Sequence, residues 1–423
     1  MSIKAVKGTK DILPWESPLW HHVETVCREV FSSAFYQEIR TPVFEKTELF
    51  ARGIGEFSDI VSKEMYTFQD KGGEWLTLRP EYTASVIRSY IQHHYEQQSP
   101  LHKLWYVGPL FRQERPQAGR LRQFHQFGIE LIGSEYPEAD AEVITLACEI
   151  YQKVGLREWE LHINSIGNTK DRLRYIQLLA ESLKPHFDAF CPVCRKRFDI
   201  NILRLFDCKN KSCQKLLDDH APKITDHLSP EDNAHFEQVC KLLDVQGITY
   251  TINPKLVRGL DYYTRTTFEI KGKQLGAQDA LCGGGRYDNL VEELGGKSTP
   301  AVGFAAGVER LILALEAEKI ADVPASRPDL YIATLDVESY QGILKTCTTL
   351  RHQGFVIETD LLRRSVKAMM RDANKKQAQY VTVIGPEELE SGTLTLKNLQ
   401  TGETSQIAWN ELGKALGKER HTL

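Results

Sequence analysis

Two apolar segments that flank an arginine-rich stretch constrain the fold of this chain more than any other feature. Strand patterns occur at "HKLWYVGPL" and "FGIELIG", and the four arginines lie between them in "FRQERPQAGRLRQFHQFGIE", from Phe111 to Glu130. This pattern predicts a β-hairpin at the edge of a hydrophobic sheet. Arginine binds phosphate through two parallel donors and stays charged. We therefore expect the hairpin to hold a ligand rich in negative charge; a solvated charged hairpin is the alternative.

The segments around this hairpin predict an α+β domain built on an antiparallel sheet. Residues 16–36 have the spacing of an amphipathic helix, and Pro42 in the next segment suits an extended edge strand. A strand that ends at Leu78 precedes a helix that begins near Pro80. Consecutive strands joined by hairpins favour antiparallel pairing. Residues from about 170 to 245 carry mainly helical patterns, which predicts a helical insertion in this domain.

A second domain is predicted after the proline-bearing segment "VPASRPDL". Strand patterns at "DLYIATL", "FVIETDL" and "YVTVIG" alternate there with helical patterns over residues 338–353 and 365–377. Such alternation predicts a small α/β domain with a mostly parallel sheet. We therefore place the first domain at residues 1–325 and the second at residues 326–423.

Composition restricts the class of protein. The formal net charge is -4, so binding of nucleic acid would depend on local basic patches. The first residues, "MSIKAVKGTKDILP", are polar, and no apolar run approaches the roughly 20 residues of a membrane helix. Nine cysteines without a secretory signal favour reduced thiols. We therefore expect a cytoplasmic protein.

Three further segments carry residues suited to a ligand site. "LVRGLDYY" combines Arg258 with Tyr262 and Tyr263, which suits a small substrate with a carboxylate and a polar ring. "LCGGGRYDNL" combines Tyr287 with three glycines, which let backbone approach a ligand closely. "VGFAAGVERL" places Arg310 at the start of a helix, where it could reach a terminal phosphate. Taken singly, each has a simpler explanation: half-buried loop residues, a tight turn, or an exposed side chain on a core helix.

The predicted insertion contains four cysteines, Cys191, Cys194, Cys208 and Cys213, in the pattern C-x2-C-x13-C-x4-C. Four thiolates can bind zinc as a tetrahedron. The spacing of the second pair departs from the usual zinc knuckle, so a structural zinc is an open alternative and not the favoured prediction. Such a zinc ion would hold the insertion together without taking part in catalysis.

In the second domain, basic residues recur every four positions at Arg363, Lys367, Arg371 and Lys375. This spacing predicts a basic stripe on one helix, which could follow a phosphate backbone. The alternative is an ordinary solvated helix face.

Together these motifs resemble the class II aminoacyl-tRNA synthetases, and specifically the bacterial histidyl-tRNA synthetase family. The segment "KGTKDILP" resembles the N-terminal signature, "RTPVFEKTELF" resembles motif 1, the arginine hairpin resembles motif 2, and "VGFAAGVERL" resembles motif 3. The segments "LVRGLDYY" and "ALCGGGRYDNL" resemble the two histidine-specific segments. The resemblance covers nearly the whole chain, and it implies a class II catalytic domain followed by an anticodon-binding domain.

The resemblance also implies the reaction and its residues. Histidine and ATP, with Mg²⁺, would give histidyl-adenylate and pyrophosphate, and the histidyl group would then pass to tRNA(His). The catalytic residues implied are Arg112, Arg258 and Arg310. The ATP-binding residues implied are Arg112, Glu114, Arg120, Phe124 and Arg310. The histidine-binding residues implied are Glu81, Thr83, Arg112, Gln126, Glu130, Arg258, Tyr262, Tyr263 and Tyr287. The implied contacts to the tRNA acceptor end are Arg115 and Gln117.

A homodimer is a further implication, through the proline of motif 1, and two rival functions remain. One is a non-catalytic paralogue that serves as the regulatory subunit of ATP phosphoribosyltransferase. The complete set of three catalytic arginines and the second domain argue against it. The other is an RNA-binding protein with a zinc module, in which Glu81, Glu130 and Tyr263 would have no purpose.

Overall fold

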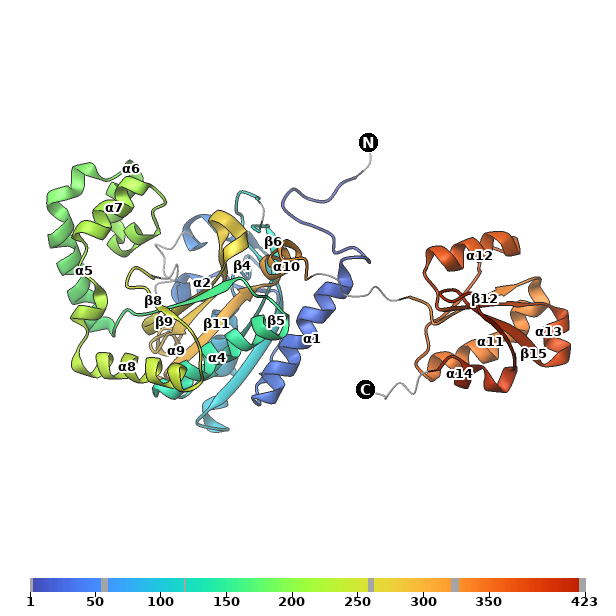
Figure 1. Ribbon diagram of the computed structural model, residues 1–423. Helices are drawn as coiled ribbons and strands as arrows, with labels where there is room; N and C mark the ends of the chain where they lie inside the picture. Colours follow the sequence, from blue (N-terminus) through green and yellow to red (C-terminus); the bar gives the residue numbers. More distant parts are fainter. Residues whose placement is uncertain (1–2, 55–59, 118, 258–261, 321–326, 418–423) are drawn as a thin grey trace. The chain divides into compact units, whose positions relative to one another are not determined.

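The chain divides into two compact units, Met1–Val323 and Pro324–Leu423 (Figure 1). A computed structural model describes residues 3–54, 60–117, 119–257, 262–320 and 327–417. Within these ranges, no helix is long and apolar enough to cross a membrane.

An eight-stranded sheet forms the centre of the first unit, with the strand order β1-β5-β6-β11-β10-β9-β7-β8. The strands are β1 (Gln37–Glu38), β5 (His102–Phe111), β6 (Gln123–Ile132), β7 (Trp159–Ser165), β8 (Thr251–Ile252), β9 (Thr264–Gly272), β10 (Ala280–Arg286) and β11 (Ala301–Gly307). All neighbours are antiparallel except the terminal pairs β1–β5 and β7–β8. The predicted arginine hairpin is β5–β6. It lies inside the sheet and not at its edge, because β1 and β11 pair with its outer sides.

Four helices cover one face of this sheet (Figure 1). They are α1 (Ser17–Ser33), α4 (Pro137–Lys153), α8 (Pro230–Val245) and α10 (Val308–Ala317). On β6, the side chains of Phe127, Ile129 and Leu131 are buried against this layer. Because side chains alternate along a strand, Gln126 and Glu130 fall on the opposite face. The prediction of an antiparallel sheet flanked by helices is confirmed.

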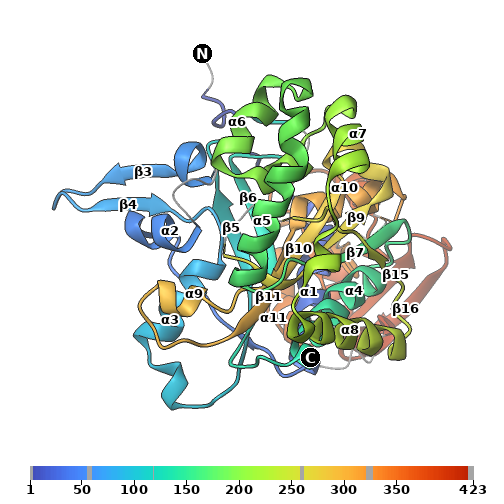
Figure 2. The ribbon, with the colours of Figure 1, turned by 90° about the vertical axis from the view of Figure 1, so that its left-hand side faces the viewer.

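The opposite face carries smaller elements. Helices α2 (Thr47–Ile54), α3 (Thr83–Gln92) and α9 (Leu290–Glu293) contact one another, and a three-stranded antiparallel sheet, β2 (Phe44–Lys46), β4 (Trp75–Leu78) and β3 (Tyr66–Gln69), adjoins them. Strands β3 and β4 form a ribbon that projects from the unit (Figure 2). Short helical turns are η1 (Ile60–Glu64), η2 (Tyr95–Gln97) and η6 (Lys273–Gln278).

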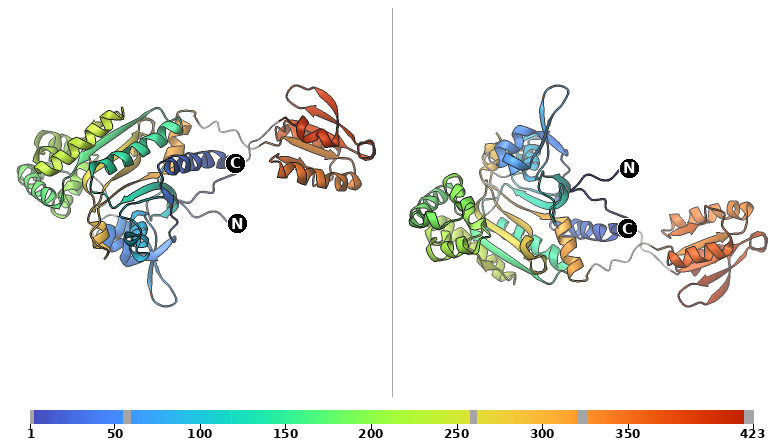
Figure 3. Two further views of the ribbon diagram at one scale, coloured as in Figure 1. Left: turned by 90° about the horizontal axis from the view of Figure 1, so that it is seen from below. Right: turned by 90° about the horizontal axis from the view of Figure 1, so that it is seen from above.

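The predicted helical insertion consists of two parts. An outer bundle contains α5 (Thr169–Leu183), η3 (Lys184–Ala189), α6 (Pro192–Ile200), η4 (Ile202–Asp207), α7 (Lys211–His220) and η5 (Ile224–His227), and it lies at one end of the unit (Figure 3). By contrast, α8 packs against α4 in the helix layer. Its residues Phe236, Val239 and Leu243 are buried in the same core as the sheet, which explains why the last helix of the segment leaves the bundle.

The second unit contains a five-stranded sheet with the order β13-β12-β14-β15-β16. Its strands are β12 (Leu330–Thr334), β13 (Ile357–Thr359), β14 (Tyr380–Ile384), β15 (Thr393–Asn398) and β16 (Thr404–Ala408), and its helices are α11 (Val337–His352), α12 (Val366–Lys375), α13 (Pro386–Ser391) and α14 (Leu412–Ala415). The first three strands are parallel, as predicted. The antiparallel hairpin β15–β16 was not predicted.

The basic stripe predicted on α12 is shorter than its sequence spacing indicated. Lys367, Arg371 and Lys375 lie on α12 and are exposed, whereas Met369 on the same helix is buried. Arg363 precedes the helix in a left-handed conformation, with φ of 51°. Three basic residues, and not four, therefore share the exposed helix face.

Candidate active site

Most of the predicted site residues line one cavity of about 250 Å³ on the face of the sheet opposite the helix layer. Those that line it are Glu81, Thr83, Arg112, Glu114, Arg120, Phe124, Gln126, Tyr262, Tyr263, Tyr287 and Arg310. Glu130 lies in β6 beside this cavity and contacts its lining. Arg115 and Gln117 are exposed on the hairpin loop. Arg258 lies outside the described residues.

Glycines of the central strands make room for the cavity and for Glu130. In the register of β6 and β11, Gly303 pairs with Glu130 and Gly307 with Gln126. A methyl group on Gly303 would lie 2.0 Å from Oε2 of Glu130, so only glycine fits there. The three glycines that follow Cys282 lie within β10 and not in a turn, which corrects the tight-turn alternative. The central strands β6, β10 and β11 thus form one side of the cavity.

Glu130 is the centre of a buried hydrogen-bond network. Its Oε1 accepts hydrogen bonds from Thr83 Oγ1 at 2.8 Å and from the Tyr106 hydroxyl at 3.1 Å, and its Oε2 accepts one from the Tyr287 hydroxyl. Burial raises the pKa of Glu130 to about 8. Sequence analysis did not identify Tyr106, which reads as an apolar strand residue. Its pairing with Gly128 in the hairpin register is the signal that places it beside Glu130.

A second carboxyl, Glu81, lies at the start of α3. Its Oε1 accepts a hydrogen bond from the Ala84 amide at 2.9 Å, and burial raises its pKa. A cation or a protonated amine could therefore replace the lost solvation of this carboxyl, since a buried charge is stable only when it is paired. The site thus presents two buried acidic groups, one just before α3 and one on the sheet.

The hairpin brings cations to the other side of the cavity. Arg112 donates from Nε to the Pro80 carbonyl at 2.9 Å, and its guanidinium carbon lies 5.2 Å from the Phe124 ring centroid. Glu114 lies between two arginines, with its Oε1 3.9 Å from Nη1 of Arg112 and its Oε2 3.3 Å from Nη1 of Arg120. One carboxylate therefore faces two guanidinium groups, which leaves an excess of positive charge.

Arg310 adds a third guanidinium from α10. Its Nε donates to the Gly119 carbonyl at 3.1 Å and its Nη1 to the Ala280 carbonyl at 2.7 Å, so the side chain is fixed between the hairpin loop and β10. Burial lowers the pKa of Arg310, and the neighbouring charges of Arg120 and Arg112 lower it further. An anion placed among these arginines would relieve their mutual repulsion.

Two polar contacts that were not predicted hold the site together. Glu309 accepts hydrogen bonds from the backbone amide of His125 at 2.9 and 3.0 Å, and its Oε1 lies 3.0 Å from Nδ1 of His125, which ties α10 to β6. Arg286 is fully buried and pairs with Asp140 of α4. Arg286 thus points into the helix layer and not toward the ligand cavity, although Tyr287 beside it lines the cavity.

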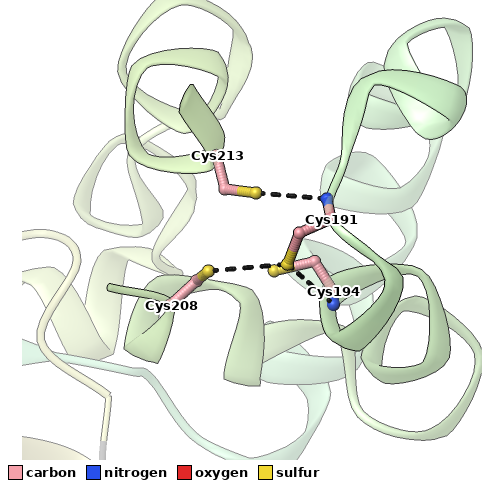
Figure 4. Close-up of side chains that lie close together, drawn as sticks. All are labelled: Cys191, Cys194, Cys208 and Cys213. Atoms are coloured by element: carbon pink, nitrogen blue, oxygen red, sulfur yellow. Dashed lines mark hydrogen bonds between the residues drawn. The ribbon is translucent and has the colours of Figure 1, made fainter. Parts of the chain in front are cut away.

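The outer bundle holds a separate group of side chains. The sulfur atoms of Cys191, Cys194, Cys208 and Cys213 lie within 4.8 Å of one another (Figure 4). In the described part of the chain, this is the one group of three or more His, Cys, Asp or Glu residues that could hold a metal ion.

Comparison with known proteins supports a family assignment. A family model described as histidyl-tRNA synthetase matches residues 8–191 and 199–311, and one described as an anticodon binding domain matches residues 329–419. The histidine–tRNA ligase of Halothermothrix orenii is 50% identical over 407 residues, which cover 96% of this chain and 97% of the relative. That of Caldanaerobacter subterraneus is 48% identical over 416 residues, which cover 98% and 100%.

Solved structures show the same relationship. The crystal structure of apo Staphylococcus aureus histidyl-tRNA synthetase matches with a TM-score of 0.83 and 41% identity, over 99% of this chain and 100% of that one. A Bacillus halodurans structure described as an ATP phosphoribosyltransferase regulatory subunit/histidyl-tRNA synthetase is 22% identical, with a TM-score of 0.65, and shares the fold. The arginine-lined cavity on an antiparallel sheet, the family models and the close relatives agree, and the chain belongs to the histidyl-tRNA synthetase family.

Proposed function

We propose that this protein is a histidine–tRNA ligase that works in two steps. In the first, a carboxylate oxygen of histidine attacks the α-phosphorus of ATP, the bond from this phosphorus to the bridging oxygen breaks, and pyrophosphate leaves. In the second, a hydroxyl of the terminal ribose of tRNA(His) attacks the histidyl carbonyl, and AMP leaves. The observation that carries the proposal is that three arginines and two buried carboxyls line or adjoin one cavity.

The arginine side of the cavity suits ATP. Arg112 would hold the α-phosphate and Arg310 the γ-phosphate, while Arg120 adds charge between them. Phe124, partly covered by the Arg112 guanidinium, would stack on the adenine, and Glu114 would accept a hydrogen bond from the adenine amino group. Because both reactants of the first step are anions, fixed cations reduce their repulsion and stabilise the charge that develops on the phosphoryl oxygens.

Mg²⁺ would neutralise charge on the phosphates of the bound ATP. Its ligands would come largely from ATP and water, as is usual for this ion.

The carboxyl side of the cavity suits histidine. Glu81, Thr83 and Gln126 would hold the α-amino group, and because burial raises the pKa of Glu81, a bound ammonium group would favour its charged form. Glu130 and Tyr263 would each bond one imidazole nitrogen. An amino acid with an apolar ring would leave the buried Glu130 without that partner, at a cost of about 1–3 kcal/mol or more.

Two aromatic side chains would complete the histidine pocket. Tyr262 lies with its ring centroid 4.8 Å from that of Tyr263 and 5.6 Å from that of Tyr287, and all three rings line the cavity. These three tyrosine rings would limit the size of the substrate side chain that fits beside Glu130. Arg258, which lies outside the described residues, would lie between the histidine carboxylate and the α-phosphate and contact both, as the family pattern implies.

The exposed tip of the hairpin suits the tRNA acceptor end. Arg115 and Gln117 are exposed there, whereas Arg112 lies in the cavity. The two arginines therefore form a matched pair for an experiment. Arg112→Ala should abolish both adenylate formation and charging, whereas Arg115→Ala should mainly slow transfer to tRNA. Equal losses in both steps for both variants would contradict this division of roles.

A homodimer would cover apolar side chains of the small sheet. Phe44 and Phe68, which the strand register places on one face of this sheet, are 52% and 43% exposed in the single chain. Large exposed side chains grouped on one element are typical of a protein interface. Light scattering of the wild type and of Phe68→Glu would test this proposal, because a dimer through this sheet should weaken in the variant while a monomer would show no change.

The decisive experiment for the proposed function is ATP–pyrophosphate exchange with each amino acid and no tRNA. Exchange with histidine alone would support both the adenylate chemistry and the imidazole pocket. Binding of histidine without exchange would instead favour the regulatory paralogue, and no binding of histidine would contradict the proposed pocket.

A further inference from the structure

The four cysteines of the outer bundle come from three separate elements. Cys191 precedes α6 and Cys194 lies in its first turn, Cys208 follows η4, and Cys213 lies in the first turn of α7. Their sulfur atoms nevertheless converge within 4.8 Å of one another (Figure 4). The chain thus brings four thiol groups that are up to 22 residues apart to a single point.

The distances fit a tetrahedral metal site. Zinc–sulfur bonds of about 2.3 Å place the sulfur atoms of a four-cysteine site about 3.8 Å apart. The sulfurs of Cys191 and Cys208 are 3.9 Å apart, and every other pair lies within 4.8 Å. A disulfide requires about 2.05 Å between its sulfurs, and all four cysteines are free thiols. The cluster is therefore closer to a metal site than to a pair of disulfides.

Backbone amides are already directed at these sulfurs. The amide of Cys191 donates to the sulfur of Cys213 at 3.3 Å, that of Asn210 to Cys208 at 3.4 Å, and that of Cys194 to Cys191 at 3.5 Å. Such hydrogen bonds stabilise the negative charge of metal-bound thiolates and fix the orientation of the ligands. Basic residues also flank the ligands in the sequence, at 195–197 and at Lys209 and Lys211, and they would offset the net negative charge of four thiolates and one divalent cation.

A metal would join the short helices of the outer bundle in addition to their apolar contacts. Helices α6 and α7 have 9 and 10 residues, and η4 between them has 6. Helices this short are marginal in water without tertiary support. Small subdomains of this kind commonly depend on a metal or disulfides for stability.

We propose that Cys191, Cys194, Cys208 and Cys213 together bind one Zn²⁺ ion, which joins α6, η4 and α7 into a fixed bundle. Four thiolates in a tetrahedron select zinc among the common divalent ions, with iron as the main competitor. The site is separate from the residues proposed for ATP and histidine. A failure of this proposal would thus leave the proposed function untouched.

The first test is metal analysis of the full-length protein, purified without chelators. We expect one zinc per chain, and we expect the content to fall at least roughly tenfold in Cys194→Ser and Cys213→Ser, since loss of one ligand opens a structural site. Cys240→Ser on α8 is the control, because Cys240 is also a free thiol but lies outside the cluster. It should retain the full zinc content.

A second test uses the wild type alone, in case the variants fold poorly. A mercurial reagent that titrates thiols should release zinc in step with the first four thiols that react. Replacement by Co²⁺ should give the strong visible absorption of a tetrahedral thiolate site. Hydrogen exchange should then show that metal release exposes amides of residues 190–220 before those of the sheet.

Three outcomes would overturn the proposal. The first is protein free of zinc that also fails to bind added Co²⁺ after reduction. The second is iron in place of zinc, with the absorption of an iron–thiolate centre. The third is a shortfall of two or more free thiols in the denatured, unreduced protein, which would indicate disulfides within the cluster.

Discussion

Replacement of Glu130 by glutamine would test whether this buried carboxyl is protonated in the empty site. Glu130 is 1% exposed, and burial raises its pKa from an ordinary value of 4.5 to about 8. Hydrogen bonds from Tyr287, Thr83 and Tyr106 lower the pKa, but they do not offset the effect of burial. Glutamine has nearly the same shape and can still accept hydrogen bonds through its oxygen, but it does not titrate. The difference between the two proteins therefore isolates the titration of one group.

The expected pH dependence follows from the two pKa values. Below pH 4.5 the carboxyl is protonated in both the folded and the unfolded chain, so pH has no effect through this group. Between pH 4.5 and about 8 it is protonated only in the folded chain, so the free energy of unfolding falls as pH rises. The slope is about 1.4 kcal/mol per pH unit, and the total loss is of the order of 5 kcal/mol. Above pH 8 the contribution is constant.

Denaturant unfolding between pH 5 and about 9 would measure this difference. Five of the six tryptophans lie in the first unit, so their fluorescence reports mainly on the unit that contains Glu130. The wild type should lose stability relative to Glu130→Gln as pH rises to 8. Glu29→Gln, at an exposed position of α1, is the control and should follow the wild type. Parallel curves for the wild type and Glu130→Gln would refute the raised pKa.

Three further variants test other parts of the site. Arg286→Met should lower the free energy of unfolding by about 3–5 kcal/mol, because it leaves the buried Asp140 without its partner; a fall of less than about 1 kcal/mol in urea unfolding would contradict this. Gly303→Ala should abolish histidine-dependent exchange, because its methyl group would lie 2.0 Å from Oε2 of Glu130; exchange at the wild-type rate would show that this side of the cavity can move. Arg310→Lys should raise the KM for ATP by about tenfold, with little change in the KM for histidine, since lysine cannot reproduce a planar fork of donors. Equal changes in both constants would contradict a role in ATP binding.

The sequence predicted best those features that depend on local spacing. The apolar segments around the arginines predicted the hairpin β5–β6, and the positions of Arg112, Arg120 and Phe124 beside the cavity follow from that hairpin. Gln126 and Glu130 were implied by the family resemblance, and strand alternation explains why they share one face, because side chains two apart along a strand point the same way.

Features that depend on distant contacts were not predicted. Tyr106 joins the Glu130 network only through the pairing of β5 with β6, and its sequence neighbours are those of any apolar strand. Arg286 follows a glycine cluster and suggests a ligand contact, yet it pairs with Asp140, which is 146 residues away. Whether a polar side chain faces a ligand or a structural partner depends on which element packs behind it, and the sequence around it does not reveal this.

The hydrogen bonds to Glu130 leave room for one more donor, and this explains how the pocket would recognise an imidazole. Each carboxylate oxygen can accept about two hydrogen bonds. Oε1 accepts from Thr83 and Tyr106, whereas Oε2 accepts from Tyr287 alone. Without a ligand, the raised pKa of Glu130 means that its carboxyl is protonated at neutral pH, and the proton occupies the remaining acceptor position of Oε2. A bound imidazole would supply its own N–H there, so the carboxyl must lose its proton, to solvent or to the second nitrogen of the ring. Amino acids without such a donor offer no group to replace that proton. The same Glu130→Gln variant should therefore lose the pH-dependent stability, which comes from burial of the carboxyl, and also the preference for histidine, which comes from the acceptor position left on Oε2.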